Sequence, residues 1–286
     1  MKIVLCGSSG FLGSALKAFF LQNKYEVVTF SIRSSTSIES IVECLDNADV
    51  VINLSGANII GRWSDDYKVI LRQSRLESTQ KLVDAIKASH NPPHTYINAS
   101  AVGIYDEKHR HNEQSHEYAT DFLATLVRDW EAIAFGAQSS RTRVCATRFG
   151  VVYGKNGGAM AKMLPPFKMG LGGKMGEGSQ VVSWIHIDDL VRGYDFLINH
   201  SHIQGIVNFT APHPLTNTQQ TRIMGVELHR PTFLSVPAWV VRLIFGEGSA
   251  VMLDSKEAVP AVLIQEGFEF NYPTFERAFR EIVAVG

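Results

Sequence analysis

Met1-Lys2-Ile3-Val4-Leu5-Cys6-Gly7-Ser8-Ser9-Gly10-Phe11-Leu12-Gly13 opens the chain and decides its fold. The apolar run up to Cys6 predicts a buried strand, and the apolar spacing that begins at Phe11 predicts a helix. Strand, glycine turn and helix together form the context in which spaced glycines indicate dinucleotide binding. The spacing is G-x-x-G-x-x-G rather than G-x-G-x-x-G. The prediction of dinucleotide binding therefore depends mostly on the position of these glycines directly after a strand.

Each glycine of this loop has a separate predicted task. Gly7 can adopt a positive φ and turn the chain sharply. Gly10 lets the backbone approach a pyrophosphate, and Gly13 lets the helix pack close to the strand. The free N–H groups at the helix start would then face the phosphates. The loop residues that we expect to hold a cofactor are Gly7, Ser9, Gly10, Phe11, Leu12 and Gly13.

Bulk properties limit the class of protein. The chain has 286 residues, of which 45% are apolar and 19% charged, as in ordinary globular enzymes. A net charge of −1 argues against a nucleic-acid surface, and no apolar run is long enough to span a membrane. The cysteines lack the spacing of a disulfide framework, so we expect free thiols in a reducing compartment. Because a strand stands where a signal peptide would, we expect a cytoplasmic protein.

Strands and helices alternate through the first two thirds of the chain. We expect strands at 1–6, 25–30, 49–54, 94–99, 143–149, 181–187 and 205–210. We expect helices at 38–45, 65–89, 119–137 and from a cap at Asp188 to Asn199. This alternation predicts an α/β fold with a doubly wound parallel sheet. The short stretch between Phe30 and Asp49 suggests that one of the usual six strands is abbreviated.

The composition changes after residue 211, where prolines separate short segments with a helical pattern. We expect 1–211 to form the nucleotide-binding domain and 212–286 to form a small, mainly helical portion packed on the sheet edge on the substrate side. The segment from Gly154 to Gly178 is rich in glycine and lysine and follows a strand end. Ligands of doubly wound folds bind outside the carboxyl ends of the strands, so we expect this segment in the pocket wall.

Further motifs accompany the first loop in a fixed order. They are 53–59 (NLSGANI), 100–105 (SAVGIY), 148–154 (RFGVVYG), 171–173 (LGG), 184–190 (WIHIDDL), and, near the end, Pro260 with 267–270 (GFEF) and 272–274 (YPT). With these motifs the chain resembles the extended, or atypical, branch of the short-chain dehydrogenase/reductase superfamily. More narrowly, it is similar to bacterial "epimerase family" proteins that end in a small domain of unassigned function. The resemblance covers essentially the whole chain and implies an NAD(P)-binding Rossmann fold.

Arg33 and Ser31 follow the second predicted strand. An NAD-specific site normally has an acidic residue there to bind the ribose hydroxyls, and the segment Phe30-Ser31-Ile32-Arg33-Ser34 has none. An arginine with neighbouring hydroxyls instead suits a 2′-phosphate, through charge-assisted hydrogen bonds. We therefore expect NADP(H) as the cofactor, the alternative being a solvated loop arginine.

Three smaller predictions complete the cofactor site. Small residues at Leu54-Ser55-Gly56 would let the backbone pass close to the ribose and pyrophosphate, or would simply make a tight turn. Arg75 is placed at the start of the long helix, where its charge opposes the helix dipole, so an anion would hold it. The alternative for Arg75 is a surface salt bridge. The family resemblance implies that Val152 closes over the nicotinamide end.

The usual catalytic pair is missing. Active members of the superfamily use a tyrosine followed four residues later by a lysine, which lowers the tyrosine pKa so that it can exchange a proton with the substrate. No tyrosine of this chain has that lysine. Counting back from Glu131 places Leu123 and Val127 at the two positions. Ala101, beside Ser100, stands at the position of the family's serine.

No other group can be assigned to catalysis from the sequence. The hydroxyls and charges that we considered are more typical of structural or solvated positions: Ser100, Tyr105, Tyr118, Lys108, Lys162, His186 and Asp188. We also interpret His109 and His111 as solvated loop residues and expect no metal site.

Two functions remain open. One is an NADP(H)-dependent oxidoreductase or epimerase acting on a small polar substrate, for example a nucleotide-linked sugar. The other is a non-catalytic NADP(H)-binding sensor or scaffold. The retained pocket segment favours the first and the absent tyrosine and lysine favour the second. The sequence leaves open whether the protein is a monomer or a homodimer.

Overall fold

A six-stranded parallel sheet forms the centre of the computed structural model, which describes residues 1–32, 37–155 and 157–284. The strand order is β11-β6-β4-β3-β1-β2, and every neighbouring pair is parallel. The strands are β1 (Lys2–Cys6), β2 (Glu26–Phe30), β3 (Val50–Asn53), β4 (Thr95–Ala101), β6 (Arg143–Phe149) and β11 (Gly205–Phe209). The predicted doubly wound α/β fold is therefore confirmed.

The stretch between β2 and β3 explains how the sheet differs from the common plan. The usual order of six strands places two strands beyond the first, whereas here only β2 lies beyond β1. The described residues of the stretch hold the helix α2 (Ile38–Leu45) and no strand. The chain therefore returns through α2 directly to β3, and β11 completes the sheet at the other edge.

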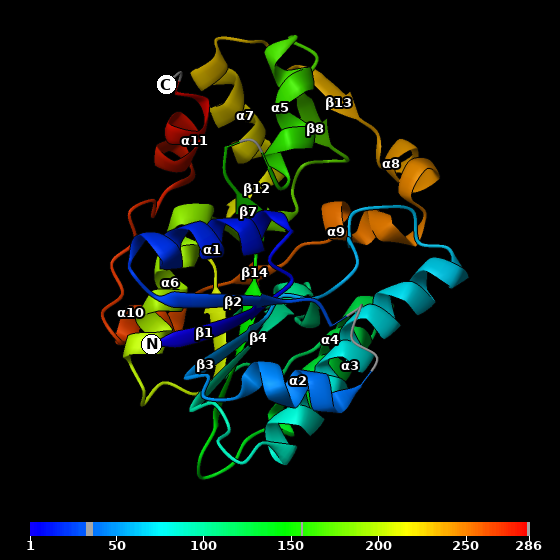
Figure 1. Ribbon diagram of the computed structural model, residues 1–286. Helices are drawn as coiled ribbons and strands as arrows, with labels where there is room; N and C mark the ends of the chain where they lie inside the picture. Colours follow the sequence, from blue (N-terminus) through cyan, green and yellow to red (C-terminus); the bar gives the residue numbers. More distant parts are fainter. Residues whose placement is uncertain (33–36, 156, 285–286) are drawn as a thin grey trace.

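Helices cover both faces of the sheet (Figure 1). α1 (Phe11–Gln22), α6 (Ile187–Asn199) and α10 (Ala261–Gln265) pack on one face, and α2, α3 (Asp65–Ala88) and α4 (Phe122–Phe135) on the other. Along β1, Ile3 and Leu5 enter the first core while Val4 and Cys6 enter the second. A strand buried on both faces reads as a continuous apolar run, which is why β1 could be recognised in the sequence.

Two predicted helix starts need correction. α4 begins at Phe122 rather than at Ala119, because the Asp121 side chain accepts the N–H of Ala124 at 2.8 Å and caps the helix. The cap of α6 is His186, whose Nδ1 accepts the N–H of Asp188 at 3.3 Å. Asp188 therefore lies in the first turn, where its charge suits the helix dipole.

The chain before α6 also differs from the prediction. The strand expected at 181–187 is two short strands outside the main sheet, β9 (Val181–Val182) and β10 (Trp184–His186).

A second lobe stands over the carboxyl ends of the strands, at the top of Figure 1. It contains β7 (Val151–Tyr153), α5 (Met160–Lys168), β8 (Gly173–Met175), β12 (Leu215–Thr216), α7 (Asn217–Leu228), β13 (Leu234–Val236), α8 (Ala238–Phe245) and α11 (Phe275–Val283). Its core joins Tyr153, Met160 and Trp184 to Met224 and Phe279. Residues from both sides of position 211 thus share one core, and the division of the chain at 211 stays a prediction.

Two carboxylates, the half-buried Glu113 and the buried Asp189, tie the last part of the chain to the sheet. Glu113 accepts the N–H groups of Asn208 at 2.9 Å and of Ala261 at 3.1 Å, and so links β11 to α10. Asp189 of α6 accepts two further N–H groups, from Asn271 and Tyr272, at 2.8 Å. The remaining short elements are η1 (Val102–Ile104), β5 (Arg110–His111), η2 (Glu247–Ser249), α9 (Ala250–Leu253) and β14 (Glu257–Ala258).

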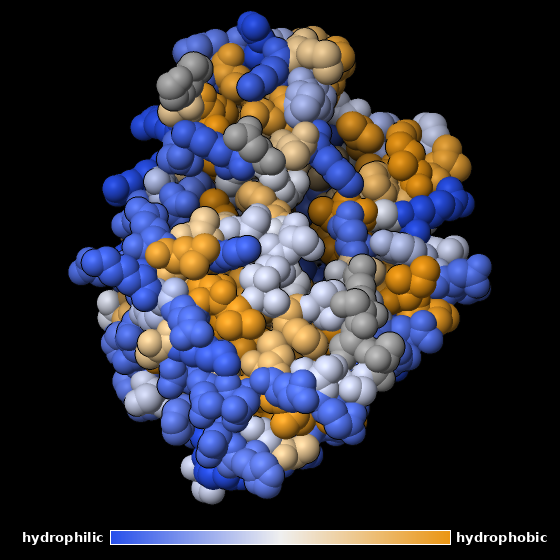
Figure 2. Space-filling model, in the orientation of Figure 1, coloured by the Kyte–Doolittle hydropathy of each residue, from blue (hydrophilic) through white to orange (hydrophobic). Residues whose placement is uncertain are grey.

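Helix α8 turns three large apolar side chains outward. Val241 is its one buried residue, while Trp239, Leu243 and Ile244 are exposed. Figure 2 shows this apolar surface at the upper right, over the position of α8 in Figure 1. Within the described ranges, no helix combines the length and apolar character needed to cross a membrane.

Candidate functional site

A cleft of about 690 Å³ lies at the carboxyl edge of the sheet. Its walls come from the β1–α1 loop, the ends of β3, β4 and β6, one side of α4, and the segment from α9 to β14. Ligands of doubly wound folds bind at this edge. A smaller hollow of about 490 Å³ between α7 and α11 contains none of the predicted site residues.

The cleft gathers most of the residues predicted to bind a cofactor. Those that line it are Gly7, Gly10, Phe11, Leu12, Gly13, Leu54, Ser55, Gly56, Arg75 and Val152. Ser9 and Ser31 are exposed and do not line it. Arg33 lies outside the described residues.

The glycine loop has the shape that a pyrophosphate needs. Gly7 has φ +82°, and a Cβ there would lie 2.9 Å from the Leu54 carbonyl. A Cβ on Gly13 would lie 2.2 Å from the Gly7 oxygen, so Gly13 is required for packing. A Cβ on Gly10 would meet only the Gly7 oxygen, at 3.7 Å. Gly10 therefore leaves open space at the start of α1, where N–H groups without a side-chain cap suit an anion.

Arg75 reaches the cleft, but not from a helix start. It lies in the middle of α3, so the argument from the helix dipole was wrong. Its guanidinium donates to the carbonyl oxygens of Ala57 at 3.0 Å and of Leu71 at 3.3 Å. It also stands 5.4 Å from the Trp130 ring centroid. Backbone carbonyls and a ring therefore hold this charge at the cleft wall.

The glycine-rich segment predicted to form a pocket wall contributes little to it. Of the described residues between Gly154 and Gly178, only Gly158, Ala159 and Lys162 line the cleft. Strand β8 pairs instead with β13 in the second lobe. The cleft wall opposite the glycine loop thus comes from other parts of the chain.

The three residues that we predicted at the positions of the family's catalytic groups form an apolar wall of the cleft. Leu123 and Val127 line the cleft one turn apart on α4, and Ala101 lines it from the end of β4. Leu123 packs over Gly103, where an added Cβ would lie 2.5 Å from its Cδ2 atom. None of these side chains can exchange a proton.

Ser100 is held from behind this wall. Its hydroxyl donates to Glu131 Oε1, and Arg148 donates to both oxygens of Glu131, at 2.8 and 2.7 Å. Glu131 and Arg148 are buried. Burial alone would lower the pKa of Arg148, but Glu131 raises it above its ordinary value. Because the Ser100 proton is directed at Glu131, the hydroxyl oxygen can only accept a hydrogen bond from a ligand in the cleft.

The two tyrosines that we considered lie behind the cleft rather than in it. The Tyr105 hydroxyl donates to Asn208 Oδ1 at 2.9 Å, and burial raises the pKa of Tyr105. The Arg148 guanidinium stands 4.9 Å from the Tyr105 ring and 5.4 Å from the Tyr118 ring. Neither ring lines the cleft, and neither does Lys108.

The C-terminal segment supplies charged groups that the sequence did not reveal. Asp254 and Lys256 line the cleft, together with Asp121 at the start of α4. Burial raises the pKa of Asp254 to about 6, and the negative charge of Glu107 adds to the shift. No local motif marks Asp254, because only folding brings it to residues of α4. A carboxyl with a raised pKa in a cleft is a candidate functional group.

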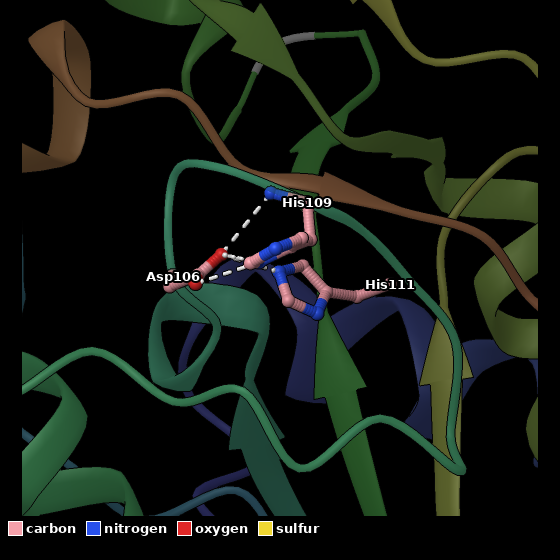
Figure 3. A group of neighbouring side chains, drawn as sticks. All are labelled: Asp106, His109 and His111. Atoms are coloured by element: carbon pink, nitrogen blue, oxygen red, sulfur yellow. Dashed lines mark hydrogen bonds and ion pairs between the residues drawn. The ribbon is translucent and has the colours of Figure 1, made fainter.

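A cluster of Asp106, His109 and His111 follows η1 (Figure 3). His109 Nδ1 lies 2.9 Å from Asp106 Oδ2, and His111 Nε2 lies 3.0 Å from Asp106 Oδ1. Burial would raise the pKa of Asp106, but these contacts and the N–H of Lys108 hold it well below its usual range. His111 is buried and stacks on Tyr105, so its interpretation as a solvated residue was wrong.

The surroundings of His111 favour a structural cluster over a metal centre. A histidine that binds a metal through one nitrogen normally donates the other N–H to an acceptor. His111 Nδ1 is buried and has no partner among the described residues. Ligation through Nε2 would leave this N–H without an acceptor, so the cluster lacks one feature of a typical metal site, and the absence of a metal stays a prediction.

Two models of known families match separate parts of the chain. The model of the NAD dependent epimerase/dehydratase family matches residues 3–209. The chain belongs to this family. A second model, for a domain of unknown function (DUF1731), matches residues 236–282. The predicted resemblance to epimerase family proteins with a C-terminal domain of unassigned function is thereby confirmed.

Relatives match over nearly the whole chain. Epimerase family protein SDR39U1 of Mus musculus is 34% identical, with 99% of this chain and 100% of that protein aligned. The crystal structure of human epimerase family protein SDR39U1 with NADPH has a TM-score of 0.93 at 32% identity, covering 99% of each chain. A nucleoside-diphosphate sugar epimerase from Corynebacterium glutamicum has a TM-score of 0.79 at 30% identity, covering 99% of this chain and 58% of that one.

Proposed function

We propose that the protein is an NADP(H)-dependent oxidoreductase or epimerase that acts on a small polar substrate without a tyrosine–lysine pair. The observation that carries the proposal is the cleft itself. It joins a glycine loop with open space at Gly10 to a wall that bears Asp254 and Lys256. The human relative crystallised with NADPH supports NADP(H) as the cofactor.

The cofactor residues divide by the part of NADP(H) that they would hold. The loop from Gly7 to Gly13 would surround the pyrophosphate, and the turn from Leu54 to Gly56 would lie against the adenine-side ribose. Arg75 would face a phosphate or ribose, and Val152 the nicotinamide end. Ser31 and Arg33 would contact the 2′-phosphate. When bound, NADPH supplies a hydride.

Polar groups in the cleft wall support a small polar substrate. Asp121, Asp254 and Lys256 offer acceptors and a donor suited to hydroxyl groups. The relative from Corynebacterium glutamicum, described as a nucleoside-diphosphate sugar epimerase, makes a nucleotide-linked sugar the first compound to test. We place the protein in the cytoplasm, because free thiols suit a reducing compartment.

Titration calorimetry with NADPH and NADH tests the cofactor. We expect NADPH to bind more tightly, and equal affinities would contradict the proposed NADP(H) specificity. NADPH oxidation across aldehydes, ketones and nucleotide-linked keto-sugars tests the activity. General acid–base catalysis contributes about 10²–10⁴-fold, so an altered proton donor should make turnover slow or selective. No turnover with any of these compounds would contradict an oxidoreductase.

A second function, a non-catalytic NADP(H) sensor or scaffold, is favoured by two observations. Leu123 and Val127 replace the usual catalytic side chains in the cleft wall, and α8 exposes an apolar face suited to a protein contact. The sensor predicts tight NADPH binding without turnover, and a partner whose affinity changes with NADPH.

A further inference from the structure

We infer that Asp254, from the C-terminal domain, is the general acid and base of this cleft in place of the missing tyrosine. The inference rests on the proposed oxidoreductase function and adds the residue that moves the proton. It also gives the C-terminal domain a catalytic task.

The packing of α9 brings Asp254 to the apolar wall. Val251 of α9 packs in one cluster with Leu123 and with Phe122, the first residue of α4. Asp254 directly follows α9 and lines the same cleft as Leu123 and Val127. The C-terminal segment therefore carries a carboxyl to the wall on which the tyrosine and lysine would stand.

The backbone around Asp254 is held on both sides. The Asp254 N–H donates to the Ala250 carbonyl at 3.0 Å, and the Ser255 N–H donates to Glu107 Oε2 at 3.2 Å. The Lys256 N–H donates to the Val181 carbonyl at 2.9 Å. A reacting group needs such a fixed position, because a misplaced one loses much of its effect.

The Asp254 carboxyl itself has no structural task in the described part of the chain. It makes no hydrogen bond or ion pair there, in contrast to Glu113 and Asp189, which each accept backbone N–H groups. Asp121, the other carboxylate of the wall, is exposed and caps α4. An oxygen without a partner is free to bond to a substrate.

Burial, together with the surrounding charges, raises the pKa of Asp254 to about 6. Burial is the largest cause of the raised pKa of Asp254, and the negative charges of Glu107 and Asp121 raise it further. Lys256 and Arg242 act in the opposite direction. The resulting value of about 6 lets the group both give and take a proton under physiological conditions.

Two other proton carriers of the cleft each have a bond to the protein, and Lys256 keeps further N–H groups to donate to a substrate. The Ser100 proton is directed at Glu131, and the Lys256 ammonium donates to the Tyr105 carbonyl at 2.8 Å.

The proposed step is a balanced carbonyl reduction. The substrate carbon would receive a hydride with its electron pair from a C–H bond of NADPH, which would be oxidised to NADP⁺, and the C=O π bond would break. The oxygen would take the proton of the Asp254 carboxylic acid, whose O–H bond breaks to leave a carboxylate. A proton taken up from bulk solvent then restores the carboxylic acid, so that each turnover consumes one proton. In the oxidising direction the carboxylate removes the proton of a substrate hydroxyl.

The test compares Asp254→Asn with Glu107→Gln in the full-length protein. Asp254→Asn should reduce the rate of NADPH oxidation with the best compound of the panel by about 10²–10⁴-fold and leave NADPH affinity unchanged. Glu107→Gln removes a neighbouring negative charge but keeps an acceptor for Ser255. It should remain active, with a rate that falls at lower pH than in the wild type because the acid form is lost earlier.

A carboxyl titration followed by ¹³C NMR supplies a readout that needs no substrate. A resonance titrating near pH 6 should vanish in Asp254→Asn and move to lower pH in Glu107→Gln. If Asp254→Asn keeps more than about a tenth of the wild-type rate, the inference about Asp254 is wrong but the proposed function still stands. The same holds if the Asp254 signal has an ordinary pKa. A wild-type protein that turns over no compound overturns the proposed function, and the inference with it.

Discussion

The two sides of the cleft are built in opposite ways. The proposed cofactor side is centred on the loop between β1 and α1, which would hold a pyrophosphate through its backbone N–H groups and the open space left by the missing Cβ of Gly10. The opposite side combines Leu123 and Val127 of α4 with Asp254 from a segment far along the chain. The loop from Gly7 to Gly13 would bind through its backbone, so it does not depend on which side chains stand on the opposite wall. The proton donor on that wall can come from any element that reaches the cleft.

The largest expected effect is on the cofactor side. Gly10→Val should abolish measurable NADPH binding, because the side chain would occupy the open space at the start of α1. The same space should let the protein fold, as circular dichroism can show. Gly61→Val is the control and should bind NADPH normally, because a Cβ there would meet only Tyr67, at 3.9 Å, and Gly61 does not line the cleft. Binding retained in Gly10→Val would mean that the loop serves only packing.

The second effect concerns the support behind the apolar wall. Arg148→Met leaves Glu131 buried without its ion-pair partner, which should cost about 3–5 kcal/mol of the free energy of unfolding. Urea denaturation measures this loss. Arg72→Met is the control, because its half-exposed pair with Asp129, at 2.9 Å, should be worth at most about 1 kcal/mol. Equal losses in the two variants would contradict the importance of the buried pair.

The third effect returns to the cofactor. A charge-assisted hydrogen bond contributes about 1.5–3 kcal/mol, so Arg33→Ala should weaken NADPH binding by about ten- to hundredfold and leave NADH binding nearly unchanged. Calorimetry with both cofactors measures the difference. An equal loss for both would show that Arg33 does not recognise the 2′-phosphate.

The smallest expected effect is on the pH dependence of the free energy of unfolding, through Asp254 on the wall opposite the glycine loop. The pKa of Asp254 is raised from 3.8 to about 6 in the folded protein. Between these values the folded state keeps a proton that the unfolded chain has lost, so this group's contribution to stability is present at low pH and declines as the pH rises.

Asp254→Asn removes that dependence. Since Asp254 is half-exposed, screening limits the effect, and the variant should be more stable than the wild type by about 1 kcal/mol at about pH 8 and nearly equal to it at about pH 4. Urea denaturation across this range measures the difference. A difference that does not change with pH would show that Asp254 has an ordinary pKa.

Local patterns explain which parts of the site could be predicted. The loop from Gly7 to Gly13 and the turn from Leu54 to Gly56 each act within a few residues, so their spacing predicts their geometry. Arg75 was predicted at the cleft for the wrong reason, since its position comes from the carbonyls of Leu71 and Ala57. His111 was misread because its burial depends on packing against Tyr105.

The sequence by itself determined the doubly wound fold, the glycine loop from Gly7 to Gly13 and the absence of a tyrosine–lysine pair, because each depends on short-range periodicity or spacing. Only the tertiary structure decided which residues stand opposite that loop. Asp254 has no local signature, and its raised pKa arises from burial and from Glu107, two effects that exist only once the chain is folded. Charge and solvation at a site depend on neighbours in space, whereas strands, helices and glycine turns depend mostly on neighbours in the chain.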